Sequence, residues 1–273
     1  MNDRPEPTAT TEYKPMENTA VKTNNKDLVP LYQRMYRDGT LRFTTSMSET
    51  SALLQKTDWR GKTVLEIGCG EGDLAAMIGI HCAAHVTAID FAQSGIDAAN
   101  THYQLPNVEF RCCDFVDIEG RFDAIVMEGT IEHMDDPLSA LKAMADDHLN
   151  RPGQIITSSP SFLNPRGYVW MALQLLLDVP MSLSDRHFLC PFDFERFAGE
   201  IGARMDYLSV DQDWGHGDRL IEDFDQRLRN ALRDRGLEAD VDRFLEWLKQ
   251  TVEYGSYNEF SGANIVYELA FDC

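Results

Sequence analysis

The residues with the clearest chemical potential lie at a glycine-rich turn that follows a short apolar run. Segment 64–74 reads Val-Leu-Glu-Ile-Gly-Cys-Gly-Glu-Gly-Asp-Leu, with Glu66 near its start. Glycines allow positive φ angles and let a ligand approach the backbone closely. Asp90 ends the next apolar run, twenty residues after Gly70, where an acid can accept hydrogen bonds from ribose hydroxyls. The pattern predicts an adenosine or dinucleotide site.

The spacing of the glycines separates two classes of cofactor. A nicotinamide site has the pattern G-x-G-x-x-G/A, and its turn holds a pyrophosphate. Counting that pattern from Gly68 puts Asp73 at the last position, where a carboxylate would face the pyrophosphate. S-adenosylmethionine has no phosphate and carries a positive sulfonium and ammonium, so the acids around the turn suit it better. We therefore expect S-adenosylmethionine as the cofactor and disfavour a nicotinamide oxidoreductase.

The turn resembles the first motif of the class I S-adenosylmethionine-dependent methyltransferases. The resemblance covers about residues 53–202 and includes Cys113-Asp114-Phe115, which is similar to the family's adenine-edge motif. It implies that Glu66 lies beside the methionine part of the cofactor, that Asp90 holds the ribose and that Asp114 holds the adenine amine. The cofactor-binding residues that we expect are Glu66, Gly68, Cys69, Gly70, Gly72, Asp90, Phe91, Asp114, Phe115 and Glu128.

A second group of chemically able residues follows the fourth apolar run, in segment 127–137. Glu132 and His133 resemble the Glu-His pair of the ubiquinone-biosynthesis O-methyltransferases and their small-molecule relatives. A histidine titrates near neutral pH and could take a proton from a hydroxyl as a methyl group arrives. We expect His133 to be the catalytic base; alternatively, the pair caps or orients the following helix. The residues expected to contact the acceptor are Glu132, Tyr36, His187 and Trp214.

The elements that must position these residues alternate between apolar runs and amphipathic segments. The expected strands are 63–67, 85–89, 108–112, 124–127, 154–157, 207–210 and 265–271, with crossover segments at 74–80, 93–103, 115–121 and 137–149. Alternating units of this kind predict a mostly parallel sheet covered on both faces. We expect an α/β fold with a Rossmann-like, doubly wound, seven-stranded sheet, mostly parallel with an antiparallel last strand, plus helical insertions.

The other segments are expected to extend a single domain, residues 27–273. Residues 1–26 have almost no large aliphatic side chains and are expected to form a disordered tail. Residues 27–60 are expected to form cap helices, and 160–200 and 211–260 to form helical insertions around a substrate pocket. The apolar helix at 164–178 fits core or oligomer packing as well as a substrate lid. Loop variation sets the acceptor, so the sequence does not name it.

Composition limits the partners. The 273 residues carry a net charge of −20, which repels nucleic acid. No apolar run approaches the roughly 20 residues that span a bilayer, and no signal-peptide pattern opens the chain, so we expect a cytoplasmic protein without stable membrane insertion. The six cysteines form no CxxC pair and the histidines show no ligand spacing, so we expect reduced thiols and no metal.

The expected function is methyl transfer from S-adenosylmethionine to a small-molecule acceptor, through an SN2 step at an oxygen atom. N-methylation of a small molecule and a catalytically inactive, cofactor-binding subunit remain open alternatives. A homodimer also remains open, because nothing in the sequence settles the oligomeric state.

Overall fold

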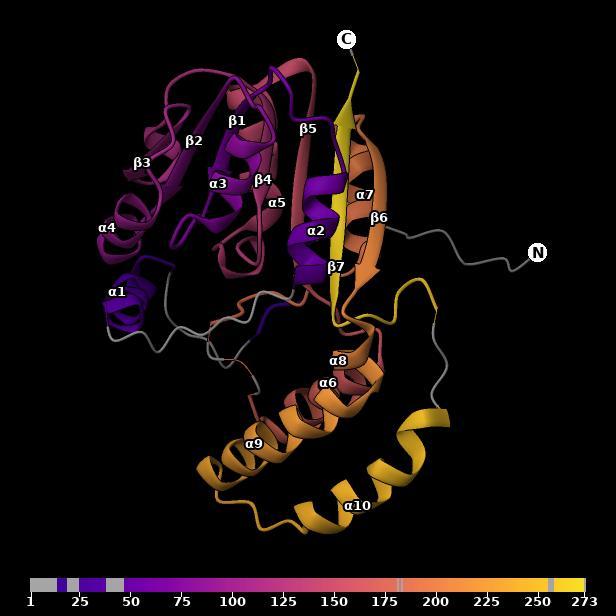
Figure 1. Cartoon of the computed structure of the whole chain (residues 1–273). Helices are drawn as coiled ribbons and strands as arrows, with labels where there is room; N and C mark the ends of the chain where they lie inside the picture. The colour runs from indigo at the N-terminus through magenta and orange to yellow at the C-terminus, as the bar shows by residue number, and fades with distance from the viewer. Residues whose placement is uncertain are drawn as a thin grey trace, which may run out of the picture.

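The computed structural model describes residues 14–18, 25–37, 47–180, 182, 184–254 and 258–272. At its centre lies a seven-stranded sheet with the order β3-β2-β1-β4-β5-β7-β6 (Figure 1). The strands are β1 Thr63–Ile67, β2 His85–Asp90, β3 Val108–Cys112, β4 Phe122–Met127, β5 Leu149–Pro160, β6 Arg204–Val210 and β7 Asn264–Phe271. Strands β1 to β5 pair in parallel, and β7 runs antiparallel to both β5 and β6. The predicted fold class is confirmed.

The sheet is buried on both faces, which explains why its central strands are continuous apolar runs. Val64 and Leu65 are adjacent in β1 and both fully buried, and successive side chains of a strand point to opposite faces. Leu65 packs in one core with Ile125 and with Phe194 of helix α7. Val64 packs in the other core, where Ile78 of helix α3 covers it.

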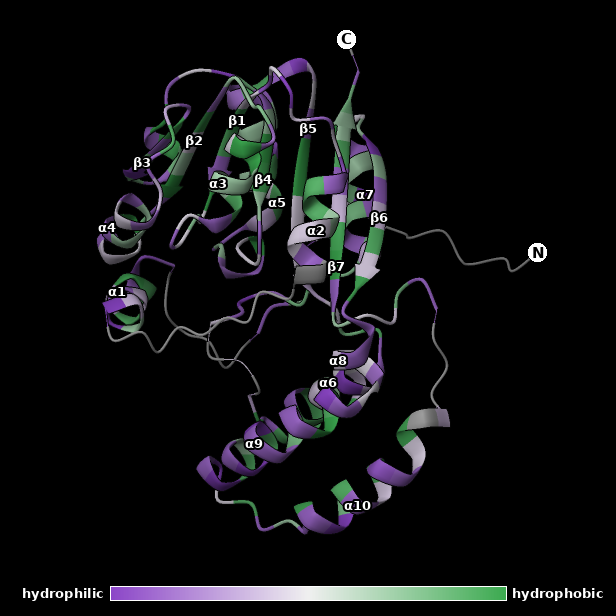
Figure 2. Cartoon of the chain, viewed as in Figure 1, coloured by the Kyte–Doolittle hydropathy of each residue, from purple (hydrophilic) through white to green (hydrophobic). Residues whose placement is uncertain are grey.

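Ten α-helices are present in the described part of the chain. They are α1 Val29–Arg37, α2 Met47–Gln55, α3 Asp73–Ile80, α4 Gln93–His102, α5 Pro137–Ala143, α6 Pro165–Leu177, α7 Pro191–Ile201, α8 Gln212–His216, α9 Asp218–Asp234 and α10 Val241–Thr251. Helices α6, α9 and α10 share a third apolar core and lie with α8 beyond one end of the sheet (Figure 1). Most residues of α9 are hydrophilic (Figure 2), whereas α6 exposes the apolar side chains of Leu175, Leu176 and Leu177. None of the described helices is long and apolar enough to cross a membrane.

Several boundaries differ from the sequence prediction for tertiary reasons. Strand β5 begins at Leu149 and ends at Pro160, well beyond 154–157, because β7 pairs with it from Gly153 to Pro160. The helix predicted at 137–149 is α-helical only to Ala143 and continues as a π-helix, Met144–His148. The crossover predicted at 115–121 contains only a short 3-10 turn, Phe115–Asp117.

Part of the predicted disordered tail is ordered. Asn18 donates a backbone hydrogen bond to the carbonyl oxygen of Arg186 (2.7 Å), and Phe188 donates one to Met16 (2.9 Å). Glu17 forms an isolated antiparallel bridge with His187. The prediction of disorder is therefore wrong for residues 14–18, which gain a strand-like pairing partner far along the chain. Residues 1–13 and 19–24 lie outside the described residues.

Candidate functional site

A cavity of about 520 Å³, the first cavity, opens at the carboxyl ends of β1, β2 and β4. Its volume falls within the range of about 300–1,000 Å³ that is typical of ligand pockets. It is lined by nine of the ten expected cofactor residues: Glu66, Gly68, Cys69, Gly70, Asp90, Phe91, Asp114, Phe115 and Glu128. Gly72 does not line the cavity. It precedes α3 at a φ of 89°, where an added Cβ would meet the ring of Phe110, so its role here is packing.

The turn between β1 and α3 needs glycine at two positions that line the first cavity. Gly68 has a φ of 78°, and an added Cβ would lie 2.7 Å from Cγ2 of Thr130. Gly70 has a φ of 53°, and an added Cβ would lie 2.8 Å from the hydroxyl of Tyr36. Both angles belong to the left-handed region that side chains disfavour. Backbone conformation and close packing therefore both require glycine at positions 68 and 70.

The carboxylate of Asp90, at the end of β2, forms hydrogen bonds with the turn that follows β1. It accepts hydrogen bonds from the backbone N–H of Gly70 (3.0 Å) and of Ala92 (2.7 Å). Burial raises the pKa of this carboxyl, although the two backbone donors work in the opposite direction. Asp90 thus fixes the glycine turn and presents its remaining acceptor capacity to the first cavity.

Helix α1 covers one side of the first cavity with two tyrosines. The ring of Tyr32 meets Phe91 edge-on, with centroids 5.6 Å apart, and lies 6.1 Å from the ring of His133. Tyr36 lies against Gly70. Burial raises the pKa of both phenols above its usual value. We expected Tyr36 to contact the acceptor, but the structure places it in the first cavity only.

Three buried carboxyl groups lie near the boundary of the first cavity. Glu66 is 2% exposed, and its Oε2 has no hydrogen-bond partner among the described residues. Glu128 accepts a hydrogen bond from the hydroxyl of Thr50 (2.7 Å). Burial raises the pKa of Glu128 to about 7, and burial with the charge of Glu128 raises that of Glu49 to about 8. Because burial disfavours the charged form of each carboxyl group, a bound cation would favour their ionised forms.

A second cavity of about 480 Å³ adjoins the first, and Glu128, Gly129 and His133 line both. Two of the expected acceptor residues, Glu132 and Trp214, line the second cavity. Its outer wall comes from the insertion helices, through Arg166 and Trp170 of α6 and Asp223 and Arg227 of α9.

The structure does not place His187 at either cavity. The side chain is 4% exposed, and its Nε2 lies 3.1 Å from the carbonyl oxygen of Asp135. Its backbone N–H donates to the carbonyl oxygen of Glu132 (3.2 Å). The expected acceptor contact is therefore unsupported, and His187 instead ties residues 14–18 to the loop after β4.

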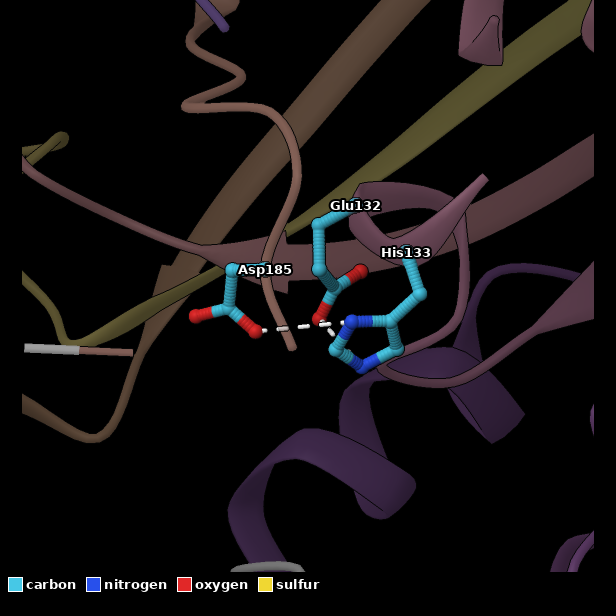
Figure 3. A group of neighbouring side chains, drawn as sticks. All are labelled: Glu132, His133 and Asp185. Atoms are coloured by element: carbon cyan, nitrogen blue, oxygen red, sulfur yellow. Dashed lines mark ion pairs between the residues drawn. The ribbon is translucent and has the colours of Figure 1, made fainter. Parts of the chain in front are cut away.

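His133 lies at the junction of the two cavities, with one face toward Glu132 and Asp185 (Figure 3). Its Nδ1 is 2.9 Å from the carbonyl oxygen of Ser184 and 3.5 Å from Oδ1 of Asp185. A carbonyl oxygen only accepts hydrogen bonds, so Nδ1 carries the proton in the neutral ring. The lone pair is then on Nε2, which lies 3.9 Å from Oε1 of Glu132. The geometry suits a base that acts through Nε2.

The same three side chains are the group that could hold a metal ion among the described residues. One ligand atom each from Glu132, His133 and Asp185 lie within 4.8 Å of one another. Carboxylate oxygens and an imidazole nitrogen are ligands that divalent cations accept. The distances to Ser184 and Asp185 also account for His133 without a cation, so the expectation of no metal stays a prediction.

The sequence analysis missed most of the second cavity. Residues that it did not single out are Glu49, Arg166, Trp170, Asp185, Asp211, Asp223, Arg227 and Asn264. They come from α2, α6, α9, the start of β7 and loops, and no local spacing connects them. A charged residue in an otherwise apolar helix start, such as Arg166 near Trp170, is the one signal that could have drawn attention.

Comparisons with known proteins agree with this site. A family described as "Methyltransferase domain" matches residues 64–153, which contain the glycine turn, Asp90, Asp114 and His133. Ubiquinone biosynthesis O-methyltransferase of Neisseria meningitidis serogroup C is 33% identical over 156 residues, which are 53% of this chain and 65% of that protein. The enzyme of the same name from Coxiella burnetii (strain Dugway 5J108-111) is 33% identical over 160 residues, or 55% of this chain and 67% of that protein.

The alignment to the Neisseria protein thus spans less than two thirds of its length. Two solved structures share the fold at low identity. A methyltransferase in a complex with the Haloferax volcanii Trm112 activator has a TM-score of 0.60 and 13% identity, covering 89% of this chain and 98% of that chain. The DhpI-SAM-HEP complex has a TM-score of 0.54 and 19% identity, covering 67% of this chain and 91% of that chain.

Proposed function

The chain belongs to the class I S-adenosylmethionine-dependent methyltransferases, and we propose that it methylates an oxygen atom of a small-molecule acceptor. The first cavity would hold S-adenosylmethionine, and the second cavity would hold the acceptor. The two cavities meet at His133, so the acceptor atom and the methyl group would meet beside this side chain.

The residues of the first cavity fit S-adenosylmethionine. Gly68 and Gly70 line the first cavity, so the turn presents backbone that a ligand could approach closely. The unpartnered Oε2 of Glu66 is buried, and a cationic ligand would offset the cost of burying it. Acidic Glu66 and Glu128 suit the ammonium and sulfonium groups, whereas a pyrophosphate would be repelled.

When bound, S-adenosylmethionine supplies a methyl group on a positively charged sulfur, which is already a strong electrophile. The chain's own contribution is position and proton transfer. Tyr32, Tyr36 and Phe91 form an aromatic part of the wall of the first cavity, against which a ligand would be positioned. Alignment of the two reactants alone can supply several kcal/mol of the barrier reduction, about 7–11 kcal/mol in well-oriented cases.

Proton removal from the acceptor hydroxyl falls to Nε2 of His133. The carbonyl oxygen of Ser184 holds the proton of the neutral ring on Nδ1 (2.9 Å), and Asp185 at 3.5 Å would stabilise the imidazolium that forms. Glu132 is buried and its pKa is raised well above the usual value, by burial first and then by Asp185.

The single observation that carries the proposal is the position of His133 on the wall that both cavities share. Incubation with methyl-labelled S-adenosylmethionine and a cell extract of small metabolites, followed by mass spectrometry, should reveal a labelled product. Fragmentation of that product identifies the methylated atom and so separates O-methylation from N-methylation.

A matched control separates an enzyme from an inactive cofactor-binding subunit. His148 directly precedes β5, lines neither cavity and is half-buried, with Nδ1 3.4 Å from the carbonyl oxygen of Gly120. We expect His133→Ala to lose the labelled product and His148→Ala to keep it. A protein that binds S-adenosylmethionine but labels nothing from any extract would contradict the proposed activity.

A further inference from the structure

A cluster of two arginines, one aspartate and one tryptophan forms the outer wall of the second cavity. Arg166 and Trp170 come from α6, and Asp223 and Arg227 come from α9; we call these four residues the arginine cluster. The two helices share an apolar core and lie together beyond the end of the sheet (Figure 1). None of the four residues belongs to the first cavity.

The two guanidinium groups share a single carboxylate within the arginine cluster. Nε of Arg166 donates to Oδ2 of Asp223 at 3.1 Å, and Nη1 of Arg227 lies 3.3 Å from Oδ1 of the same carboxylate. The side chain of Asp223 is 4% exposed, that of Arg166 is 11% exposed, and that of Arg227 is 40% exposed. Arginine stays protonated in proteins, so the arginine cluster carries one positive charge in excess of its one negative charge.

Trp170 adds a further donor at the same place. The guanidinium carbons of Arg166 and Arg227 lie 4.2 Å and 4.0 Å from its ring centroid, which holds both side chains by cation–π attraction. The indole is 4% exposed, and its Nε1–H has no hydrogen-bond partner among the described residues. A buried donor without a partner carries a cost of about 1–3 kcal/mol, so an acceptor group supplied by a ligand would be favoured here.

The acidic groups of the second cavity must be weighed against this excess of positive charge. Glu49, Glu128 and Glu132 all have pKa values raised by burial, to about 8 for Glu49 and about 7 for Glu128. They lie toward the sheet, where Glu128 also borders the first cavity. Two further acids line the second cavity: Asp185 beside His133 (3.5 Å), and Asp211, which accepts a hydrogen bond from Asn264 (3.2 Å). Burial lowers the pKa of Arg227, and the carboxylates of Asp223 and Asp185 oppose that shift.

The second cavity thus places two guanidinium groups, which share the carboxylate of Asp223, on the same lining as His133. Guanidinium groups are planar, fork-shaped donors that match the geometry of carboxylate and phosphate oxygens.

We propose that the methyl acceptor is an oxyanion-bearing small molecule whose carboxylate or phosphate binds Arg166, Arg227 and the indole N–H of Trp170. The atom to be methylated then lies at the opposite end of the molecule, beside His133. This inference rests on the proposed function and names the chemical class of its substrate.

The test begins with the labelled product from the extract experiment. The product is passed over an anion-exchange column at pH 7 and should be retained. Treatment with alkaline phosphatase should release it if the anion is a phosphate, and carbodiimide coupling to an amine should capture it if the anion is a carboxylate. A labelled product that carries no anionic group would overturn the inference and leave methyl transfer established.

Variants then test the residues with the purified acceptor. Arg166→Gln and Arg227→Gln should each raise the acceptor concentration for half-maximal rate at least tenfold, without changing the Kd for S-adenosylhomocysteine. Arg227→Lys keeps the positive charge but loses the planar pair of guanidinium donors, and should raise the half-maximal acceptor concentration by a smaller factor if the fold is retained. Arg233→Gln, also on α9 but 71% exposed and bonded to Asn230, is the matched control and should behave as the wild type.

The outcomes separate the two proposals. Unchanged half-maximal concentrations in both Gln variants would overturn the arginine assignment while methyl transfer stands. A protein that gives neither heat with S-adenosylhomocysteine nor labelled product would overturn the proposed function, and this inference with it.

Discussion

Replacing Gly68 with alanine tests how the glycine turn sets the shape of the first cavity. The alanine would have to adopt a φ near 78°, and a left-handed conformation costs about 1–2 kcal/mol for a side-chain-bearing residue. Its Cβ would also lie 2.7 Å from Cγ2 of Thr130 and closer still to Oγ1. Overpacking of this kind costs typically about 1–3 kcal/mol. Gly68→Ala should therefore lower the free energy of unfolding by about 2–5 kcal/mol.

Two further variants separate the two contributions. Gly61 has a φ of 72° but nothing within 4 Å of an added Cβ, so Gly61→Ala should lose only the conformational part, about 1–2 kcal/mol. Thr130→Ala removes the clashing atoms and the hydrogen bond to the carbonyl oxygen of Glu128 (3.1 Å). In the Gly68→Ala background it should restore the packing part, giving a favourable coupling of about 1–3 kcal/mol.

The assay is urea denaturation of the three single variants and of the Gly68→Ala/Thr130→Ala double variant, followed by fluorescence, with the dependence of the unfolding free energy on urea compared across variants. Equal losses for Gly68→Ala and Gly61→Ala, with no coupling between positions 68 and 130, would refute the steric argument. Calorimetry on the same proteins should show that Gly68→Ala weakens the binding of S-adenosylhomocysteine while Gly61→Ala does not.

Three other predictions concern the site. His133→Asn should lower kcat by about 10²–10⁴-fold, the usual contribution of general base catalysis, and leave the Kd for S-adenosylhomocysteine unchanged. An unchanged kcat in a steady-state assay of product formation would show that His133 is not the base. Asp90→Asn removes a charged acceptor for the backbone N–H of Gly70 or Ala92, and a hydrogen bond of this kind contributes about 1.5–3 kcal/mol. Calorimetry should therefore find S-adenosylhomocysteine bound at least tenfold more weakly. Equal affinity in the variant and the wild type would count against the role of Asp90. Burial raises the pKa of Glu49 to about 8, so the folded state binds this proton more tightly than the unfolded state does, and the free energy of unfolding falls as pH rises from about 4.5 to about 8. Glu49→Gln should flatten this fall, with a gain in stability of up to about 5 kcal/mol at pH 9. The same pH dependence of the unfolding free energy in both proteins would show the pKa shift to be absent.

The sequence predicted the parts of the site that are local in the chain. Gly68, Gly70 and Asp90 were identified because a strand, a tight turn and the end of the next strand follow one another at fixed spacing. The structure brings them together as expected, with the N–H of Gly70 donating to Asp90. The central strands of the sheet were predicted because buried parallel strands are continuous apolar runs.

The parts that the sequence did not predict depend on contacts between distant segments. Arg166 meets Asp223 across 57 residues of chain, and neither position carries a local pattern that separates an ion pair in a cavity from a solvated helix face. His187 was expected at the acceptor because it lies in an irregular segment, 180–191, that precedes a helix and was expected to be an active-site loop. Its burial instead results from backbone pairing with Glu17, 170 residues earlier, which no periodicity reveals.

The central claim is that the hollow at the ends of β1, β2 and β4 binds S-adenosylmethionine, and calorimetric titration tests it most directly. The account predicts saturable heat at a ratio of one ligand per chain for S-adenosylmethionine and S-adenosylhomocysteine, and none for NAD or NADP. Absence of heat with both sulfur ligands, from protein shown to be folded, would contradict it.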